Sequence, residues 1–115
     1  YAEALNEIAY DASEGSIALK QLNDVRNRAG LASLTADDVP TQESFRKAIL
    51  DERQKEFPYE GHRWFDLVRM GYAKSVLATR GQNIEDYQLL FPIPQAEIEK
   101  VGNTSILWQN PGYDR

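Results

Sequence analysis

Residues 51–69 read DERQKEFPYEGHRWFDLVR and mix charges of both signs with large aromatic side chains at helical spacing. On a period of about 3.6 residues, one face of the predicted helix begins with apolar side chains and continues with carboxylates. Its members are Phe45, Ile49, Glu52, Glu56 and then Tyr59 or Glu60. Isolated ionised carboxylates are too costly to bury, so these acids need cationic partners.

We predict that a turn at residues 58–61 brings arginines back to these acids, because Pro58 and Gly61 interrupt the helix there. Arg53, Arg63 or Arg69 would then share an ionic network with Glu52 and Glu56. The predicted structural charge network consists of Glu52, Arg53, Glu56, Arg63, Asp66 and Arg69.

The composition is that of one ordinary folded domain, with 115 residues, 42% hydrophobic and 27% charged. There are 18 acidic and 13 basic side chains, for a net charge of -5, and no run of basic residues. Nucleic acid is therefore not an expected partner. The apolar runs are all shorter than the roughly 18 residues that span a bilayer. The absence of cysteine excludes disulfides and thiolate metal sites.

Helical periodicity begins at the first residues, where Tyr1, Leu5 and Ile8 share a face with no cap before them. We therefore expect a fragment of a longer protein, with any export signal and lipid anchor upstream. Such a fragment would expose an apolar face, so we also expect dimerisation or domain exchange in isolation.

The fold class predicted is mostly α. Residues 11–15 break the first helix. A second helix then runs from Ile17 to Ala29 with apolar residues at helical spacing, and Gly30 ends it. The pair forms a hairpin of the tetratricopeptide-like kind. Residues 35–38 form one turn, and Thr41 caps a helix that Pro58 ends. Further helices are predicted at about 60–69 and 72–77.

The C-terminal part changes character after Gly81. Residues 89–94 contain two prolines and are predicted to be extended, as a strap laid across the helices. Residues 95–100 then form one or two helical turns, and residues 108–113 have turn chemistry between two aromatics.

Four blocks carry a family resemblance: residues 22–31, LNDVRNRAGL; residues 51–53, DER, with residues 60–69, EGHRWFDLVR; residues 90–94, LFPIP; and residues 109–113, QNPGY. In this order they resemble the C-terminal region of the SusD/RagB family. We therefore expect residues 1–115 to be the C-terminal portion of a SusD/RagB-like domain whose N-terminal part is absent.

The resemblance implies a function as well as a fold. Members of that family are helical outer-membrane lipoproteins of Gram-negative bacteria with tetratricopeptide-like hairpins. They bind glycans outside the cell, lie as a lid over a TonB-dependent porin of the SusC type, and deliver oligosaccharides to it. A non-catalytic protein without a cofactor, attached to the outer membrane only through an upstream lipid anchor, is the corresponding expectation here.

Two other classes of function are weighed against glycan capture. A tetratricopeptide-like hairpin alone would suit a protein-interaction module that binds no glycan. A glycosidase would need two acids across a glycosidic bond, with Glu52 and Glu56 or Glu60 as candidates. We favour a structural role in ion pairs. Acids that lie one helical turn apart and beside arginines are more simply explained as members of ion pairs than as catalytic groups.

His62 is the single histidine. It lies in no metal-ligand spacing and beside no GxSxG serine, so we expect neither a metal site nor a serine hydrolase, and a calcium site built from oxygen ligands stays open.

Aromatic side chains are the natural platforms for sugar rings. Trp64 falls on a predicted apolar helix face and is expected in the core. Tyr87 and Trp108 lie in irregular segments and are the candidate ligand-binding residues, although core packing is the favoured interpretation even for these two. No ligand residue is taken over from the SusD/RagB resemblance.

Overall fold

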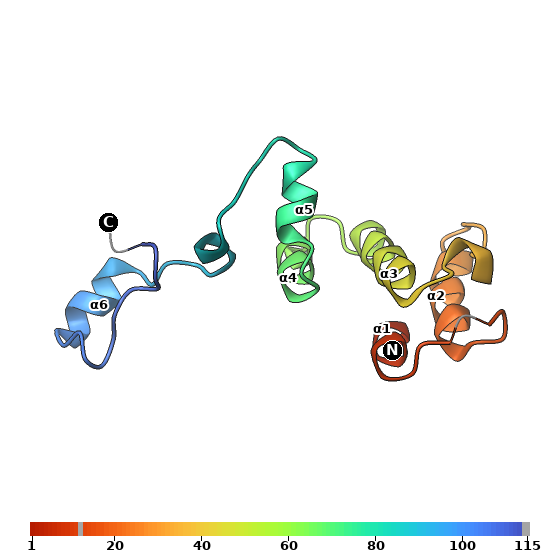
Figure 1. The fold of residues 1–115 in the computed structure, drawn as a ribbon, viewed down its shortest axis with the longest axis horizontal. Helices are drawn as coiled ribbons and strands as arrows, with labels where there is room; N and C mark the ends of the chain where they lie inside the picture. The colour runs from red at the N-terminus through yellow and green to blue at the C-terminus, as the bar shows by residue number, and fades with distance from the viewer. Residues whose placement is uncertain (12, 114–115) are drawn as a thin grey trace. The chain divides into compact units, whose positions relative to one another are not determined.

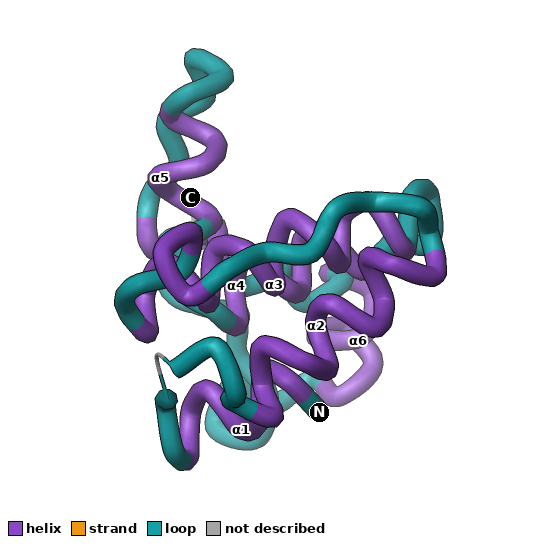
Figure 2. Tube along the Cα trace, turned by 90° about the vertical axis from the view of Figure 1, so that its right-hand side faces the viewer, coloured by secondary structure: helices purple, strands orange, loops and turns teal. Residues whose placement is uncertain are grey.

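The computed structural model describes residues 1–11 and 13–113 and divides the chain into two compact units, Tyr1–Arg63 and Trp64–Arg115. Regular structure in the described residues is entirely helical, as Figures 1 and 2 show. The predicted mostly α fold is confirmed. Ala12, which falls within the predicted break at residues 11–15, lies outside the described residues.

The first unit contains three α-helices: α1 (Ala2–Ile8), α2 (Ile17–Arg28) and α3 (Gln42–Glu56). A short 3-10 helix, η1 (Ala36–Asp38), lies between α2 and α3. Helix α1 packs against both α2 and α3, and Figure 1 shows these helices in red, orange and yellow. The predicted hairpin of α1 and α2 thus has α3 against it, while its tetratricopeptide-like geometry stays a prediction.

Helix α2 begins and ends where the sequence predicts. The Ser16 hydroxyl accepts a hydrogen bond from the Leu19 backbone N–H at 3.1 Å, and Gly30 adopts a positive φ of 75° just after the last turn. Ala18, Leu19 and Leu22 form the buried stripe. Ile17 was expected on this stripe and is exposed instead, because it precedes the positions that face the core.

The face that α1 buries is not the one that carries Tyr1 and Ile8. Tyr1 and Ile8 are exposed, whereas Asn6 is completely buried. Asn6 faces α3, where the Asn6 backbone carbonyl accepts a hydrogen bond from the side-chain amide of Gln42 at 2.7 Å. A polar contact between helices therefore sets the orientation of α1, which an apolar pattern does not reveal.

Helix α3 is the central element of the first unit. The Thr41 hydroxyl accepts from the Ser44 N–H at 3.0 Å and starts the helix, and Phe57 ends it before Pro58. Its buried side chains are Phe45, Ile49, Leu50 and Glu52. The prediction that this face continues to Tyr59 or Glu60 is wrong, because the helix ends at Glu56 and both residues are exposed.

The core of the first unit consists mainly of aliphatic side chains from α2 and α3. Burial of each large one stabilises the fold by about 1.5–3 kcal/mol. The buried apolar residues are Ala18, Leu19, Leu22, Val39, Phe45, Ile49 and Leu50. Val39 follows η1, and its carbonyl accepts from the Tyr10 hydroxyl at 3.1 Å, which ties two loops together.

The second unit begins within α4 (His62–Arg69) and continues through α5 (Ala73–Ala78), η2 (Asp86–Leu89) and α6 (Gln95–Val101). All three α-helices lie within a few residues of their predicted positions. Asp66 and Leu67 of α4 and Ala73 of α5 are buried. The turn between α4 and α5 passes through Gly71, whose positive φ of 76° suits glycine.

The predicted extended segment, residues 89–94, begins one residue too early, because Leu89 is the last residue of η2. Residues 90–94, to which we restrict the name strap, have no helical structure. The Phe91 ring lies 6.4 Å from that of Trp64 and 6.3 Å from that of Phe65, centroid to centroid. The strap thus contacts α4 through one aromatic side chain. Residues 109–113, which we call the tail, contain the predicted turn, in which the Tyr113 N–H bonds to the Asn110 carbonyl at 3.2 Å.

Candidate functional site

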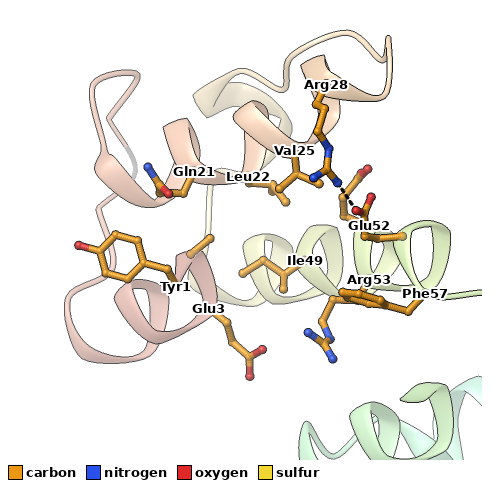
Figure 3. A pocket seen from close by; sticks show the side chains of 12 residues that line it. Tyr1, Glu3, Gln21, Leu22, Val25, Arg28, Ile49, Glu52, Arg53 and Phe57 are labelled. Atoms are coloured by element: carbon orange, nitrogen blue, oxygen red, sulfur yellow. Dashed lines mark hydrogen bonds and ion pairs between the residues drawn. The ribbon is translucent and has the colours of Figure 1, made fainter. Parts of the chain in front are cut away.

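A cavity of about 360 Å³ lies among α1, α2 and α3 in the first unit (Figure 3). Leu22 and Val25 of α2 and Ile49 of α3 supply apolar lining. The aromatic rings of Tyr1 and Phe57 lie along the same cavity at opposite sides in Figure 3. An apolar lining with aromatic rings and a few polar groups is the usual composition of a small-molecule pocket.

Glu52 is the most deeply buried charge at the cavity. Its carboxylate accepts a hydrogen bond from Arg26 Nη1 at 2.7 Å, and Lys55 Nζ lies 3.5 Å away. The side chains of Glu52 and Arg26 are only 6% and 15% exposed. Arg26 Nε also donates to the Ala32 carbonyl at 2.9 Å, so this guanidinium joins α2, α3 and the loop after α2.

Glu56 pairs with Arg28 of α2. The sequence predicted Arg53, Arg63 or Arg69 as partners, whereas these two arginines come from α2, before the helix. Residue type and spacing do not select them, because the choice depends on how α2 and α3 pack.

The other members of the predicted charge network have separate roles. The Arg53 guanidinium lies 5.2 Å from the centre of the Phe57 ring, in a cation–π contact at the cavity edge. Arg63 Nη1 donates to the Leu50 carbonyl at 2.8 Å. In the second unit, Arg69 Nη2 bonds to the buried Asp66 carboxylate at 2.9 Å. That all six residues share one ionic network stays a prediction.

A second ionic contact fastens α1 to α3. Arg46 donates from Nε and Nη2 to the two oxygens of Glu7, at 2.6 and 2.5 Å. The hydrogen bond from Arg46 lowers the pKa of Glu7, and a bond from Asn6 acts in the same direction. Glu7, Arg26, Arg28 and Arg46 were not among the predicted site residues. Only Arg26 and Arg28, inside the block at residues 22–31, carried any signal.

The two aromatic candidates lie in the second unit. Tyr87, in η2, packs edge-on against the ring of Tyr113, with centroids 5.0 Å apart. Trp108 is 61% exposed. Trp64, which was expected in the core, is only half-buried and contacts Phe91. A ligand-binding role for Tyr87 or Trp108 stays a prediction.

Glu60 is one of the alternative acids of the glycosidase hypothesis, and the metal and serine-hydrolase hypotheses depend on His62; both residues are exposed. His62 Nε2 lies 3.8 Å from Glu60 Oε2, and its ring meets that of Phe57 edge-on. Within residues 1–11 and 13–113, three acidic, histidine or cysteine side chains never gather closely enough to hold a metal ion. The same part of the chain has no helix with the length and apolarity needed to cross a membrane.

The sequence pattern of the SusD family, also called SusD/RagB, matches residues 1–85. The chain belongs to the SusD family.

Relatives in the curated proteins agree with this family. SusD-like protein P2 of Formosa agariphila is 34% identical over 97% of the chain and 23% of its own length. SusD-like protein P25 of the same organism is 36% identical over 85% of the chain and 19% of its own length. Starch-binding protein SusD of Bacteroides thetaiotaomicron is 32% identical over 87% of the chain and 18% of its own length. The chain thus spans about a fifth of these relatives, and no solved structure matches it.

Proposed function

We propose that the chain is part of a non-catalytic glycan-capture component of an outer-membrane polysaccharide uptake system. In this function the protein binds oligosaccharide outside the cell and delivers it to a TonB-dependent porin of the SusC type. The observation that carries the proposal is membership of the SusD family together with the relative that is named as starch-binding. A lipid anchor would hold the protein on the outward side of the outer membrane.

The chemistry of the cavity supports glycan binding. A pyranose has an apolar face that an aromatic ring can cover and hydroxyl groups that need polar partners. The cavity offers the rings of Tyr1 and Phe57, and Gln21 and Arg28 supply an amide and a guanidinium along its wall. These features make it the first place to test, ahead of Trp108 in the second unit.

The ion pairs of α3 support a binding role over hydrolysis. A glycosidase needs one carboxyl with a raised pKa as the acid and a second carboxylate across the scissile bond. Glu52 and Glu56 instead each receive a hydrogen bond from an arginine of α2. These bonds engage both carboxylates in fastening two helices together.

Affinity electrophoresis of the 115-residue chain in gels with and without soluble starch tests the proposal. We expect retardation in the starch gel, reduced by Phe57→Ala and Gln21→Ala. Trp108→Ala tests the alternative site, and Phe65→Ala, which removes another exposed aromatic ring of the second unit, is the matched control. Mobility unchanged by starch and by a panel of other polysaccharides would contradict glycan binding by this part of the protein.

Two further measurements separate the rival functions. Release of reducing ends from the same polysaccharides would show hydrolysis and contradict the non-catalytic role. Co-purification with a TonB-dependent porin supports the delivery role. Capture of other proteins without any glycan retardation would favour the protein-interaction module instead.

A further inference from the structure

In the second unit, side chains of the tail bind the backbone of the strap. The Gln109 amide forms a two-point pair with Ile93: Oε1 accepts from the Ile93 N–H at 2.7 Å, and Nε2 donates to the Ile93 carbonyl at 2.8 Å. Asn110 Nδ2 donates to the Phe91 carbonyl at 2.7 Å, and the Tyr113 hydroxyl donates to the Leu90 carbonyl at 3.0 Å. Three tail side chains therefore bond to three strap residues.

These bonds occupy the polar backbone groups that an extended segment would offer to a neighbouring strand. Pro92 and Pro94 have no N–H to donate. The N–H of Ile93 and the carbonyls of Leu90, Phe91 and Ile93 are taken by the tail. The pairing imitates one edge of a β-ladder, with amide and hydroxyl side chains in place of a partner strand.

The tail is itself held in shape. The Asn110 N–H donates to Gln109 Oε1 at 2.9 Å, so one amide oxygen orients both segments. Gly112 has a φ of 92° and lies against the Tyr87 ring, where a Cβ atom would come within 2.5 Å of Cγ. Only glycine fits this position without a shift, and the close approach places Tyr113 beside the strap.

The strap needs such protection. Leu90 and Phe91 are 58% and 63% exposed and lie outside the helices. An exposed apolar segment with unpaired backbone groups is a template for pairing with another chain. The two prolines remove backbone N–H donors from the strap, but they leave its backbone carbonyls available to another chain.

We propose that residues 109–113 are a latch that occupies the strap backbone along one edge, holds Phe91 against Trp64 and Phe65, and closes that edge to pairing with another extended segment. Gln109 is the main positioning residue of the latch, because it makes two of the four bonds to the strap.

Amide hydrogen exchange of Ile93, followed by NMR on the 115-residue chain, tests the latch. We expect Gln109→Ala to speed exchange of this one amide by about tenfold or more, since it removes two hydrogen bonds. Gln109→Glu keeps the acceptor for the Ile93 N–H and loses the donor, so it should give a smaller increase. Gln82→Ala, at an exposed glutamine of the same unit, should leave the rate unchanged.

Equal Ile93 exchange in the parent, Gln109→Glu and Gln109→Ala would overturn the proposal, provided that circular dichroism shows unchanged helix content. If Gln109→Ala loses its helix signal, Tyr113→Phe decides, because it removes only the bond to the Leu90 carbonyl. Exchange and self-association unchanged in that variant would then reject the latch.

Light scattering adds a second readout that simple local loosening does not predict. Opening the latch frees the strap backbone, so Gln109→Ala should self-associate at lower protein concentration than Gln82→Ala. Equal association of the two variants would reject the part of the proposal that concerns pairing with other chains.

Discussion

Arg26 of α2 and Glu52 of α3 form a nearly buried ion pair in which the donor and acceptor atoms lie 2.7 Å apart. The same guanidinium donates to the Ala32 carbonyl, so a single side chain joins two helices and the loop that leaves the first. Charges that are removed from water need good geometry and several bonds, and Arg26 has both. This pair holds α2 across α3 at the wall of the candidate glycan cavity.

Glu52→Ala should lower the free energy of unfolding by about 3–5 kcal/mol, because it leaves the Arg26 charge buried without its partner. Urea titration followed by circular dichroism measures the loss. Asp24→Ala is the control: it removes an exposed helix pair with Lys20 and should change stability by about 0.3–0.5 kcal/mol. Equal midpoints for the two variants would show that the buried pair contributes no more than a surface one.

Acid should weaken the docking of α1 through Glu7. The hydrogen bond from Arg46 lowers the pKa of Glu7 from its ordinary value of 4.5, so the folded state favours the carboxylate. The contribution of Glu7 to the free energy of unfolding is complete above its pKa in the unfolded chain. It is lost as the pH falls through its lower pKa in the folded protein. Urea midpoints measured from about pH 7 to about pH 3 should fall less steeply in Glu7→Gln than in the parent. Parallel pH profiles would assign the acid sensitivity to other groups.

Asn23→Ala should destabilise the loop after α2 by about 1–3 kcal/mol. The Asn23 amide makes a two-point pair with Leu34, accepting from its N–H at 2.8 Å and donating to its carbonyl at 2.9 Å. Asn27→Ala, which removes an exposed bond to the Ser33 hydroxyl, is the matched control. Thermal unfolding that ranks Asn27→Ala as the more harmful change would contradict this assignment.

Gly112→Ala should destabilise the second unit by about 1–3 kcal/mol, because the new Cβ would overlap the Tyr87 ring and the backbone lies in the left-handed region. Gly15→Ala serves as the comparison, since its Cβ would meet no heavy atom within 4 Å. Near-ultraviolet circular dichroism reports the Tyr87 and Tyr113 pair directly. An unchanged tyrosine signal in Gly112→Ala would show that the turn tolerates a side chain.

Neutral glycans should bind the cavity better than sulfated or uronate-rich ones, if the proposed function holds. The guanidinium of Arg28 is engaged with Glu56, that of Arg53 lies over Phe57, and the chain carries a net charge of -5. An anionic sugar would therefore have to compete with internal carboxylates. Calorimetry with neutral and anionic oligosaccharides of equal length measures the difference. Tighter binding of the anionic member would contradict this order.

Local signals in the sequence predicted most of the helices. Ser16, Thr41 and Pro58 act on their immediate neighbours, so helix starts and stops could be predicted from residue type alone. The extended strap followed in the same way from its two prolines. The sequence did not predict that Asn6 points inward or that Ile17 points outward, because each orientation depends on which surface of another helix lies opposite.

The amino-acid sequence by itself determined the helical class, the family and the need for Glu52 to have a cationic partner, since these follow from periodicity, motif order and the cost of burying charge. The tertiary structure alone decided that the partner is Arg26 and that Gln109 bonds to Ile93. Arginines and amides are common along the chain, and a hydrogen bond forms only between groups that packing brings within about 3 Å of each other.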